Sequence, residues 1–174
     1  MSVLSDSDAY QWLFGSAPGV SDDDVLAEVA TVVAAAERAI AGRCGDLEPT
    51  TITDVVTGNG GPLVLRPPVV SVTSITLDGA VQTVPTMSAA GLSAGVIPGS
   101  WTGDYTVVYV SGRTTCPPDL LMGVKELVRH LWDTTRRSAA DRRGREAAAP
   151  PASTFVFPHR VEQWIAPYVW ASLA

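Results

Sequence analysis

The sequence has little of what enzyme and metal chemistry requires. It contains two histidines, His130 and His159, and two cysteines, Cys44 and Cys116, among 174 residues. Two separated histidines are too few for most metal sites and acid–base pairs. The cysteines form no CxxC pattern, so we expect two packed thiols in place of a disulfide or a metal site. Charged residues make up only 17% of the chain against 46% hydrophobic residues, which predicts a folded chain with a buried core.

Long apolar runs and targeting signals are also missing. No apolar run approaches the roughly 20 residues that span a bilayer. The first ten residues, MSVLSDSDAY, carry acids and no basic region, so we predict no secretory signal. We therefore expect no membrane partner and a chain that stays in the cytoplasm or in an assembly made there.

The short motifs of common active sites are absent as well. The sequence has no GxxxxGK[ST], GxGxxG, GxSxG or HExxH pattern. Gly58–Gly61 (GNGG) lacks the following helix of a phosphate-binding loop, so it predicts a tight turn. The acids Asp22–Asp24 favour stabilisation of a helix N-terminus over a metal site, because consecutive helical residues point in different directions. His130 is expected to be packed or half-exposed, and His159 to lie at a surface. We predict a chain that is not an enzyme and has no cofactor or metal.

The net charge of −6 is unevenly distributed. Residues 1–48 carry nine acidic side chains and two arginines, whereas residues 129–174 carry four acidic side chains and seven arginines. An acidic front and a basic back suit head-to-tail packing of identical subunits, or docking of the basic end on an acidic partner. Two solvated faces are an equal alternative. The acidic balance argues against tight binding to duplex DNA.

The hydrophobic periodicity predicts an α+β fold that begins with an N-terminal helix. Ser21 fits an N-cap, and Gly42 and Gly45 are stop signals. Ahead of this helix, the apolar cluster 12–14 needs a partner surface, either the chain's own core or a neighbour's. The apolar stripe of the helix consists of Val25, Val29, Val32, Val33, Ala36 and Ile40.

A small antiparallel β unit follows. Pro67-Pro68 cannot donate to a ladder, so it ends a strand or lies on an edge. A phase shift at Thr73–Ser74 predicts a β-bulge, and Asp78-Gly79 predicts a hairpin. Residues 81–97 fit either short strands or a mobile loop. The run Tyr105–Val110 is the last clear strand.

A long amphipathic helix and a short C-terminal helix or arm complete the expected fold. The long helix opens at Pro117-Pro118 and ends near Arg136 and Arg137. Its stripe comprises Leu120, Leu121, Val124, Leu127, Val128, Leu131 and Trp132. We expect both long helices to pack on each other and on one face of the β unit, in a single domain. The predicted organisation is an N-terminal extension (1–20), an α+β core (21–137), an Arg/Ala-rich linker or fraying helical extension (138–152) and a C-terminal docking arm (153–174).

The basic group around the linker leaves three interpretations open. Its members could be solvated, could bind an acidic protein partner, or could contact DNA phosphates in a channel. The group consists of Arg136, Arg137, Arg142, Arg143 and Arg145.

The ordered set of segments resembles the head–tail connector (adaptor) family of long-tailed bacteriophages. After the first helix, that family has a strand region shaped like L-x-L-x-x-x-P-V-x-S-V-x-S-V. A later strand follows the shape Y-x-V-x-Y-x-x-G, and a P-x-x-L opening then leads into a long helix that ends near a tryptophan. The matching positions here are Leu63, Leu65, Pro68, Val69, Ser71, Val72, Ser74, Ile75, Tyr105, Val107, Tyr109, Gly112, Pro117, Leu120, Leu121, Leu127–Trp132, Pro167 and Tyr168. Residues 1–20 and 136–153 depart from the pattern.

The resemblance implies a structural subunit of the virion neck, assembled in the host cytoplasm. Twelve copies would form a ring under the portal protein and meet a stopper or tail-completion protein. DNA would pass through the channel without sequence-specific binding, including during genome ejection. No cofactor is implied.

The C-terminal arm is the expected portal anchor, because buried aromatics dominate interface energies. The alternative is that the arm folds back on its own subunit. The expected docking residues are Phe155, Phe157, Trp164, Tyr168 and Trp170.

Three other classes of protein compete with this interpretation, and one of them is a cellular α+β adaptor unrelated to phages. Another phage neck or tail part, such as a stopper or tail terminator, would share the β content. A small enzyme or ligand-binding domain would use Trp101, Tyr105 and Tyr109 to line a pocket, but the sequence offers no acid–base pair beside them.

Overall fold

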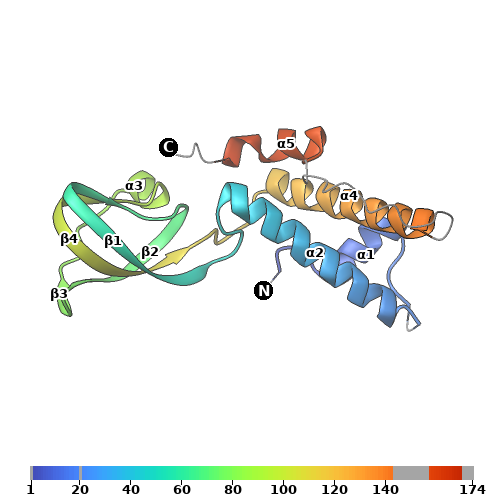
Figure 1. Cartoon of the computed structure of the whole chain (residues 1–174), viewed down its shortest axis with the longest axis horizontal. Coiled ribbons are helices and arrows are strands. Elements are labelled where there is room, and N and C mark those ends of the chain that lie inside the picture. Colours follow the sequence, from blue (N-terminus) through green and yellow to red (C-terminus); the bar gives the residue numbers. More distant parts are fainter. Residues whose placement is uncertain (1, 20, 143–156, 170–174) are drawn as a thin grey trace. The chain divides into compact units, whose positions relative to one another are not determined.

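A computed structural model of the chain describes residues 2–19, 21–142 and 157–169, with the backbone alone for residues 136–142. Helices accompany a four-stranded antiparallel sheet, which confirms the expected α+β class (Figure 1). The chain divides into two units. Residues 44–116 form a sheet unit, and the described residues of 2–43, 117–142 and 157–169 form a helical unit. Among the described residues, no helix is long and apolar enough to cross a membrane.

The sheet has the strand order β1-β4-β2-β3. It consists of β1 (Thr50–Val64), β2 (Val69–Leu77), β3 (Ala80–Gln82) and β4 (Val96–Ser111). The pairing of β1 with β4 runs from Thr50 opposite Ser111 to Val64 opposite Val96. The second half of β4 also pairs with β2, so β4 lies between the two other long strands.

The tight turn expected at Gly58–Gly61 is wrong. The chain continues through these residues as part of β1, with irregular register between Asn59 and Gly61 and again between Gly61 and Leu63. Glycine is needed at Gly58 because an added Cβ would lie 2.5 Å from the carbonyl oxygen of Trp101 on β4. The glycines therefore permit close strand approach and a bulge, not a reversal of the chain.

The other local predictions for the β unit are confirmed. The register between β2 and β4 shifts between Val72 and Ser74, where the phase of the alternation changes. Asp78 and Gly79 have φ values of 50° and 81°, and Leu77 pairs with Ala80 across them. Two consecutive positive φ values are typical of the tight turn that best matches strand twist.

The segment 81–97 contains a short helix that the sequence did not indicate. Strand β3 ends at Gln82, helix α3 spans Ala89–Ser93, and β4 begins at Val96. The hydroxyl of Ser88 caps α3 by accepting a hydrogen bond from the backbone N–H of Gly91, at 3.1 Å.

Two helices precede the sheet. Helix α1 (Asp6–Phe14) is capped by Ser5 and ends at Gly15, and it was not expected. Helix α2 (Asp23–Cys44) begins after Asp22, so the N-cap predicted at Ser21 is wrong by one residue. The Asp22 carboxylate accepts hydrogen bonds from the Gly19 N–H at 2.8 Å and the Tyr10 hydroxyl at 2.9 Å. Gly42 lies inside α2, and Gly45, with φ of 77°, follows its end.

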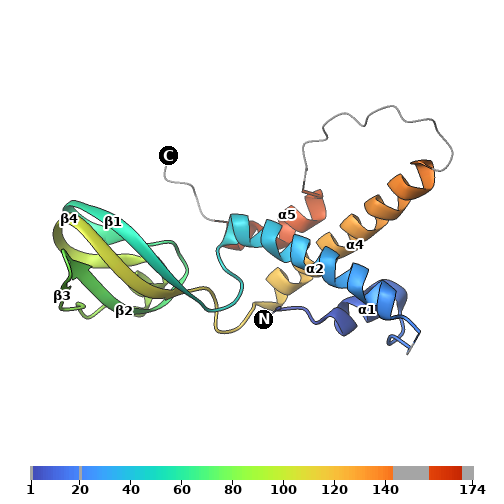
Figure 2. The ribbon, with the colours of Figure 1, turned by 60° about the horizontal axis from the view of Figure 1, so that its bottom comes forward.

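Two helices and a short 3₁₀ turn follow the sheet. Helix α4 spans Pro118–Arg142, so it passes the end predicted at Arg136 and Arg137 and enters the expected linker. Helix α5 (His159–Ile165) continues into the 3₁₀ turn η1 (Ala166–Tyr168). In Figure 2, α5 lies beside α2 and α4 within the helical unit.

Each unit has a core of its own. The chain divides into two compact units, each with buried side chains of its own, and packing of the long helices on a face of the sheet stays a prediction. The inward side chains of the sheet bury one another, and they comprise Leu63, Leu65, Val69, Ile75, Ile97, Tyr105, Val107 and Tyr109. The core of the helical unit includes Val29, Val33, Ala36, Ile40, Leu120, Val124, Leu127, Val128, Val161 and Ile165, all at most 2% exposed.

Val124 tests the helical core because its side chain is fully buried on α4. Val124→Asp should lower the free energy of unfolding by about 3 kcal/mol or more, since an unpaired carboxylate loses its hydration there. The measurement is thermal unfolding followed by far-UV circular dichroism. Thr134→Asp, at an exposed position of the same helix, is the matched control and should change little. An unchanged melting temperature for Val124→Asp would contradict this packing.

Candidate functional site

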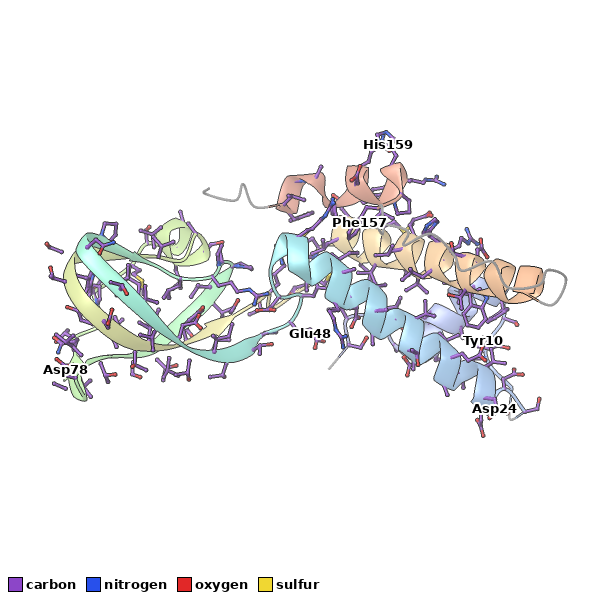
Figure 3. The ribbon with its side chains drawn as sticks, viewed as in Figure 1. Tyr10, Asp24, Glu48, Asp78, Phe157 and His159 are labelled. Atoms are coloured by element: carbon purple, nitrogen blue, oxygen red, sulfur yellow. The ribbon has the colours of Figure 1, made fainter. Side chains whose placement is uncertain are left out.

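Titratable and metal-binding side chains are scattered over the described residues. No group of three or more His, Cys, Asp or Glu side chains in this part of the chain could hold a metal ion. His130 is exposed on α4. His159 is exposed at the start of α5, where its Nε2 lies 3.2 Å from Nε2 of Gln163 (Figure 3). Cys44 is buried and Cys116 is partly buried, and neither forms a disulfide.

The most strongly perturbed side chain is Tyr109, in the middle of the sheet core. Its hydroxyl donates to Oδ2 of Asp54 on β1 at 2.6 Å and accepts from the backbone N–H of Arg66 at 3.3 Å. Burial and the hydrogen bond to Asp54 raise the pKa of Tyr109 to about 12. A phenol with this pKa remains protonated at neutral pH, so it cannot act as a base. It instead joins β4, β1 and the loop after β1.

This hydrogen bond predicts a pH dependence of stability. The folded pKa of Tyr109 lies above the ordinary value of 10, so the stabilisation is complete below pH 10 and is lost as pH rises toward 12. Tyr109→Phe should be less stable than the wild type at pH 8, because Asp54 loses its donor. The difference should shrink as pH rises from about 10 to 12. Urea unfolding of both proteins across this range measures it, and a constant difference would contradict the assignment.

The predicted docking arm contributes part of the helical core. Phe157 is 8% exposed, and the guanidinium of Arg43 from α2 lies over its ring, 4.1 Å from the centroid. Val161 and Ile165 are fully buried. Gly123 of α4 allows this packing, because an added Cβ would lie only 2.9 Å from Cγ2 of Ile165. The described part of the arm therefore folds back on its own subunit.

Of the other four predicted docking residues of the arm, two lie within the described residues. Trp164 and Tyr168 are half-buried, so each retains surface for another contact. Phe155 and Trp170 lie outside the described residues. Two ion pairs border α5, an exposed one between Arg43 and Glu162 at 3.3 Å and a longer one between exposed Arg160 and partly buried Glu126 at 3.9 Å. Such pairs contribute little, so apolar burial holds α5 in place.

The structure describes only three members of the predicted arginine group, and only their backbone. Arg136, Arg137 and Arg142 belong to the C-terminal turns of α4, where only the backbone is described. Arg143 and Arg145 lie outside the described residues. Binding of this group to an acidic protein or to DNA phosphates stays a prediction.

A cationic site on α4 was missed by the sequence reasoning. The Nζ of Lys125 lies 5.4 Å from the centroid of a Trp12 ring, and Cζ of Arg129 lies 5.3 Å from it. Trp12 reaches this position because α1 packs against α4, where the rings of Phe14 and Trp132 meet edge to face at 5.5 Å. The cluster 12–14 thus finds its partner surface within its own subunit. The spacing of Lys125 and Arg129 on one helix face was the available signal, but nothing local connects them with Trp12.

Comparison with known proteins gives a likeness in structure alone. No protein-family model matches the sequence, and no curated protein matches it. One similar solved chain comes from the neck of an empty gene transfer agent particle computed with C6 symmetry. It is 19% identical, with coverage of 93% of this chain and 89% of that chain and a TM-score of 0.58. Another comes from the virion of a native gene transfer agent particle. It is 17% identical, with coverage of 99% and 92% and a TM-score of 0.66. At sequence identities this low, the structural likeness shows a shared fold and not a shared function.

Proposed function

We propose that this chain is a structural head-to-tail adaptor in the neck of a phage-like particle. The observation that carries the proposal is the fold shared along nearly the whole of both chains with components of a gene transfer agent neck and virion. The order of sequence segments that resembles phage connector proteins supports it independently. A fold alone does not specify a function, so the ring, its partners and its place in the particle need direct tests.

The proposed assembly is a ring of twelve copies beneath the portal protein. The similar neck was computed with C6 symmetry, which is compatible with twelve copies as six pairs. The ring would extend the channel through which DNA passes during genome ejection, without sequence-specific contacts, and would present its other end to a stopper or tail-completion protein. It would be assembled in the host cytoplasm and remain in the virion. A stopper or tail terminator is the second candidate from the same particle region.

A structural role also agrees with the side-chain chemistry. The most perturbed group, Tyr109, is a protonated phenol that joins strands, and the histidines are exposed and separate. We therefore propose that the chain is not catalytic. Reproducible turnover of a nucleotide, ester or peptide that one substitution abolishes would overturn this part of the proposal.

Co-assembly with a portal ring tests the function directly. The purified chain, mixed with the portal protein of the same particle, should form a complex with one added ring, visible by electron microscopy and countable by native mass spectrometry. The resulting neck should then recruit the stopper protein. A chain that ignores the portal but binds the tail end would be a stopper or terminator instead.

Trp164 and Tyr168 are the arm residues through which we propose portal docking. They are half-buried, whereas Phe157, Val161 and Ile165 serve the chain's own core. Deleting residues 153–174 would also remove that core packing, so a loss of portal binding could result from unfolding of the chain. Trp164→Ala with Tyr168→Ala should weaken portal binding by about 2 kcal/mol or more per anchor, and far-UV circular dichroism verifies that the variant still folds.

The exposed α5 substitution Gln163→Ala is the matched control and should bind the portal normally. Binding can be measured as the concentration that saturates portal-bearing capsids. If the double variant saturates them like the wild type, α5 and η1 are not the anchor.

A further inference from the structure

We propose that neighbouring copies of this chain join edge to edge through their sheets. Strand β3 of one copy would pair antiparallel with β1 of the next copy, and Val81 would face Val55 across the contact. The inference rests on the proposed ring, and it assigns the two surfaces by which the subunits of that ring meet.

The sheet has two open edges within the described residues. Strand β1 pairs with β4 alone, and β3 pairs with β2 alone. The two strands lie at opposite sides of the sheet unit in both views (Figure 1, Figure 2). An open strand edge presents backbone N–H and C=O groups that can pair with another chain. Each copy therefore offers two different edges to its neighbours.

Neither edge carries the exposed charges that commonly prevent such pairing. The only charged residue of β1 is Asp54, which accepts the hydrogen bond from the Tyr109 hydroxyl, and β3 has no charged residue. Val55 is 71% exposed and Val81 is 76% exposed, the highest values among the large hydrophobic side chains of the described residues. One of these valines lies on each edge, so a contact between the edges would cover both.

The backbone groups of Val55 face away from β4. The N–H of Gly112 donates to the carbonyl oxygen of Pro68 at 2.8 Å, so β4 directs the backbone groups of its even-numbered residues toward β2, because these directions alternate along a strand. In agreement, the carbonyl oxygen of Thr106 accepts a hydrogen bond from the Thr76 hydroxyl at 3.2 Å. Val55 is opposite Thr106, so its own N–H and C=O are directed to the open edge.

The backbone groups of Val81 also face outward. Leu77 and Ala80 are opposite each other on the two sides of the hairpin turn, where the flanking residues exchange backbone hydrogen bonds. The next pair, Thr76 with Val81, is therefore a pair without backbone hydrogen bonds. The N–H and C=O of Val81 are directed away from β2, so both edges offer a donor and an acceptor at an exposed valine.

The two valines belong to one row of side chains across the sheet. Val55 is opposite Thr106, Thr106 is opposite Thr76, and Thr76 is opposite Val81. Side chains directly opposite one another lie on the same face of a sheet, so both valines lie on the outer face. A neighbouring sheet in line with this one would continue the row and place Val81 beside Val55.

The strand directions allow this contact to continue around a ring. Every pairing in the sheet is antiparallel, so β1 and β3, at the two ends of the order β1-β4-β2-β3, run in opposite directions. Cyclic symmetry gives all copies the same direction relative to the ring axis, so β3 of one copy meets β1 of the next antiparallel. Pairing of β1 with β1 of another copy would instead be a two-fold contact that closes at two copies.

The neighbouring cross-strand pairs in this register are compatible. With the two valines opposite each other, Thr53 would be opposite Thr83, and Asp54 would be opposite Gln82. Two threonines can form a hydrogen bond, as can an acid and an amide, and no pair joins like charges. Because β3 is short, each contact is small, and its strength in the ring depends on closure by many such contacts.

Cross-linking of single-cysteine variants tests the contact. In a background without native cysteines (Cys44→Ala, Cys116→Ala), one chain carries Val55→Cys and another carries Val81→Cys. Their mixture, treated with a short bismaleimide on portal rings and in concentrated solution, should yield a dimer with one chain of each kind. Neither variant should cross-link alone. Val64→Cys, at an exposed position further along β1, is the matched control and should not cross-link to the Val81→Cys chain.

A backbone substitution tests the same contact and keeps the native cysteines. Val55→Pro removes an N–H that is directed away from β4, so the chain should fold with a nearly unchanged melting temperature but should lose assembly into a ring. Val55→Thr keeps the N–H and a β-branched side chain, and it should assemble like the wild type. Mass photometry measures self-association, and native mass spectrometry counts the copies on each portal ring. This pair of variants decides the question if the cysteine-free chain does not fold.

The outcomes separate this inference from the proposed function. Normal assembly of Val55→Pro, or a folded cysteine mixture without the mixed dimer, would overturn the edge contact. Cross-linking of Val55→Cys to itself would identify two-fold pairing of β1 and would also overturn it. A Val55→Pro ring that forms normally but no longer recruits the stopper protein would assign β1 to a strand of that partner instead. Binding of the wild type to portal rings would uphold the proposed function in each of these cases.

Discussion

The pairing of β4 with both β1 and β2 is the interaction on which the sheet unit depends. β4 pairs along its whole length with β1 and over its second half with β2, and the register with each neighbour is irregular at defined points. These irregularities bend the strands and bring their inward side chains together. Tyr109 lies fully buried on β4, where its hydroxyl reaches β1 and the loop after it. The inward side chains of the sheet therefore bury one another, and Leu92 of α3 packs against them.

Local features of the fold could be predicted from the sequence, and distant pairings could not. The bulge at Thr73–Ser74 and the hairpin at Asp78-Gly79 follow from the phase of alternation and from turn chemistry, which neighbouring residues determine. Gly58 resembles a turn residue until its partner strand is known, because the reason for a glycine there is the backbone of Trp101. Helix α1 is short and depends on aromatic contacts with α4, so its own periodicity is weak evidence for it.

The same limit applies to the candidate interaction residues. Aromatic enrichment predicted that the C-terminal arm docks on a partner, but it could not say which of its rings the chain buries in its own core. Lys125 and Arg129 look like ordinary solvated residues in the sequence. Only the packing of α1 places Trp12 beneath them and shows that they share one site.

The side chains of the C-terminal arm form two sets that differ in burial. Phe157, Val161 and Ile165 recur at intervals of four residues and are buried in the helical unit. Trp164 and Tyr168 recur at the same interval and stay half-exposed. A segment arranged in this way is ordered before any partner arrives, so docking would not have to order it at that moment. Preorganisation of this kind raises affinity by reducing the entropy lost on binding.

The first and last residues of the sheet unit lie close together in space. The guanidinium of Arg113, just after β4, donates to the carbonyl oxygen of Cys44 at 2.8 Å and to that of Asp46 at 3.2 Å, both just before β1. Gly112 lies so close to the Glu48 carbonyl that it has no space for a side chain. Residues 44–116 are therefore an insertion with adjacent ends, which is the topology that tolerates transplantation between proteins. In descent as in engineering, such a module can be enlarged, exchanged or removed while the helices on either side of it in the sequence keep their own packing.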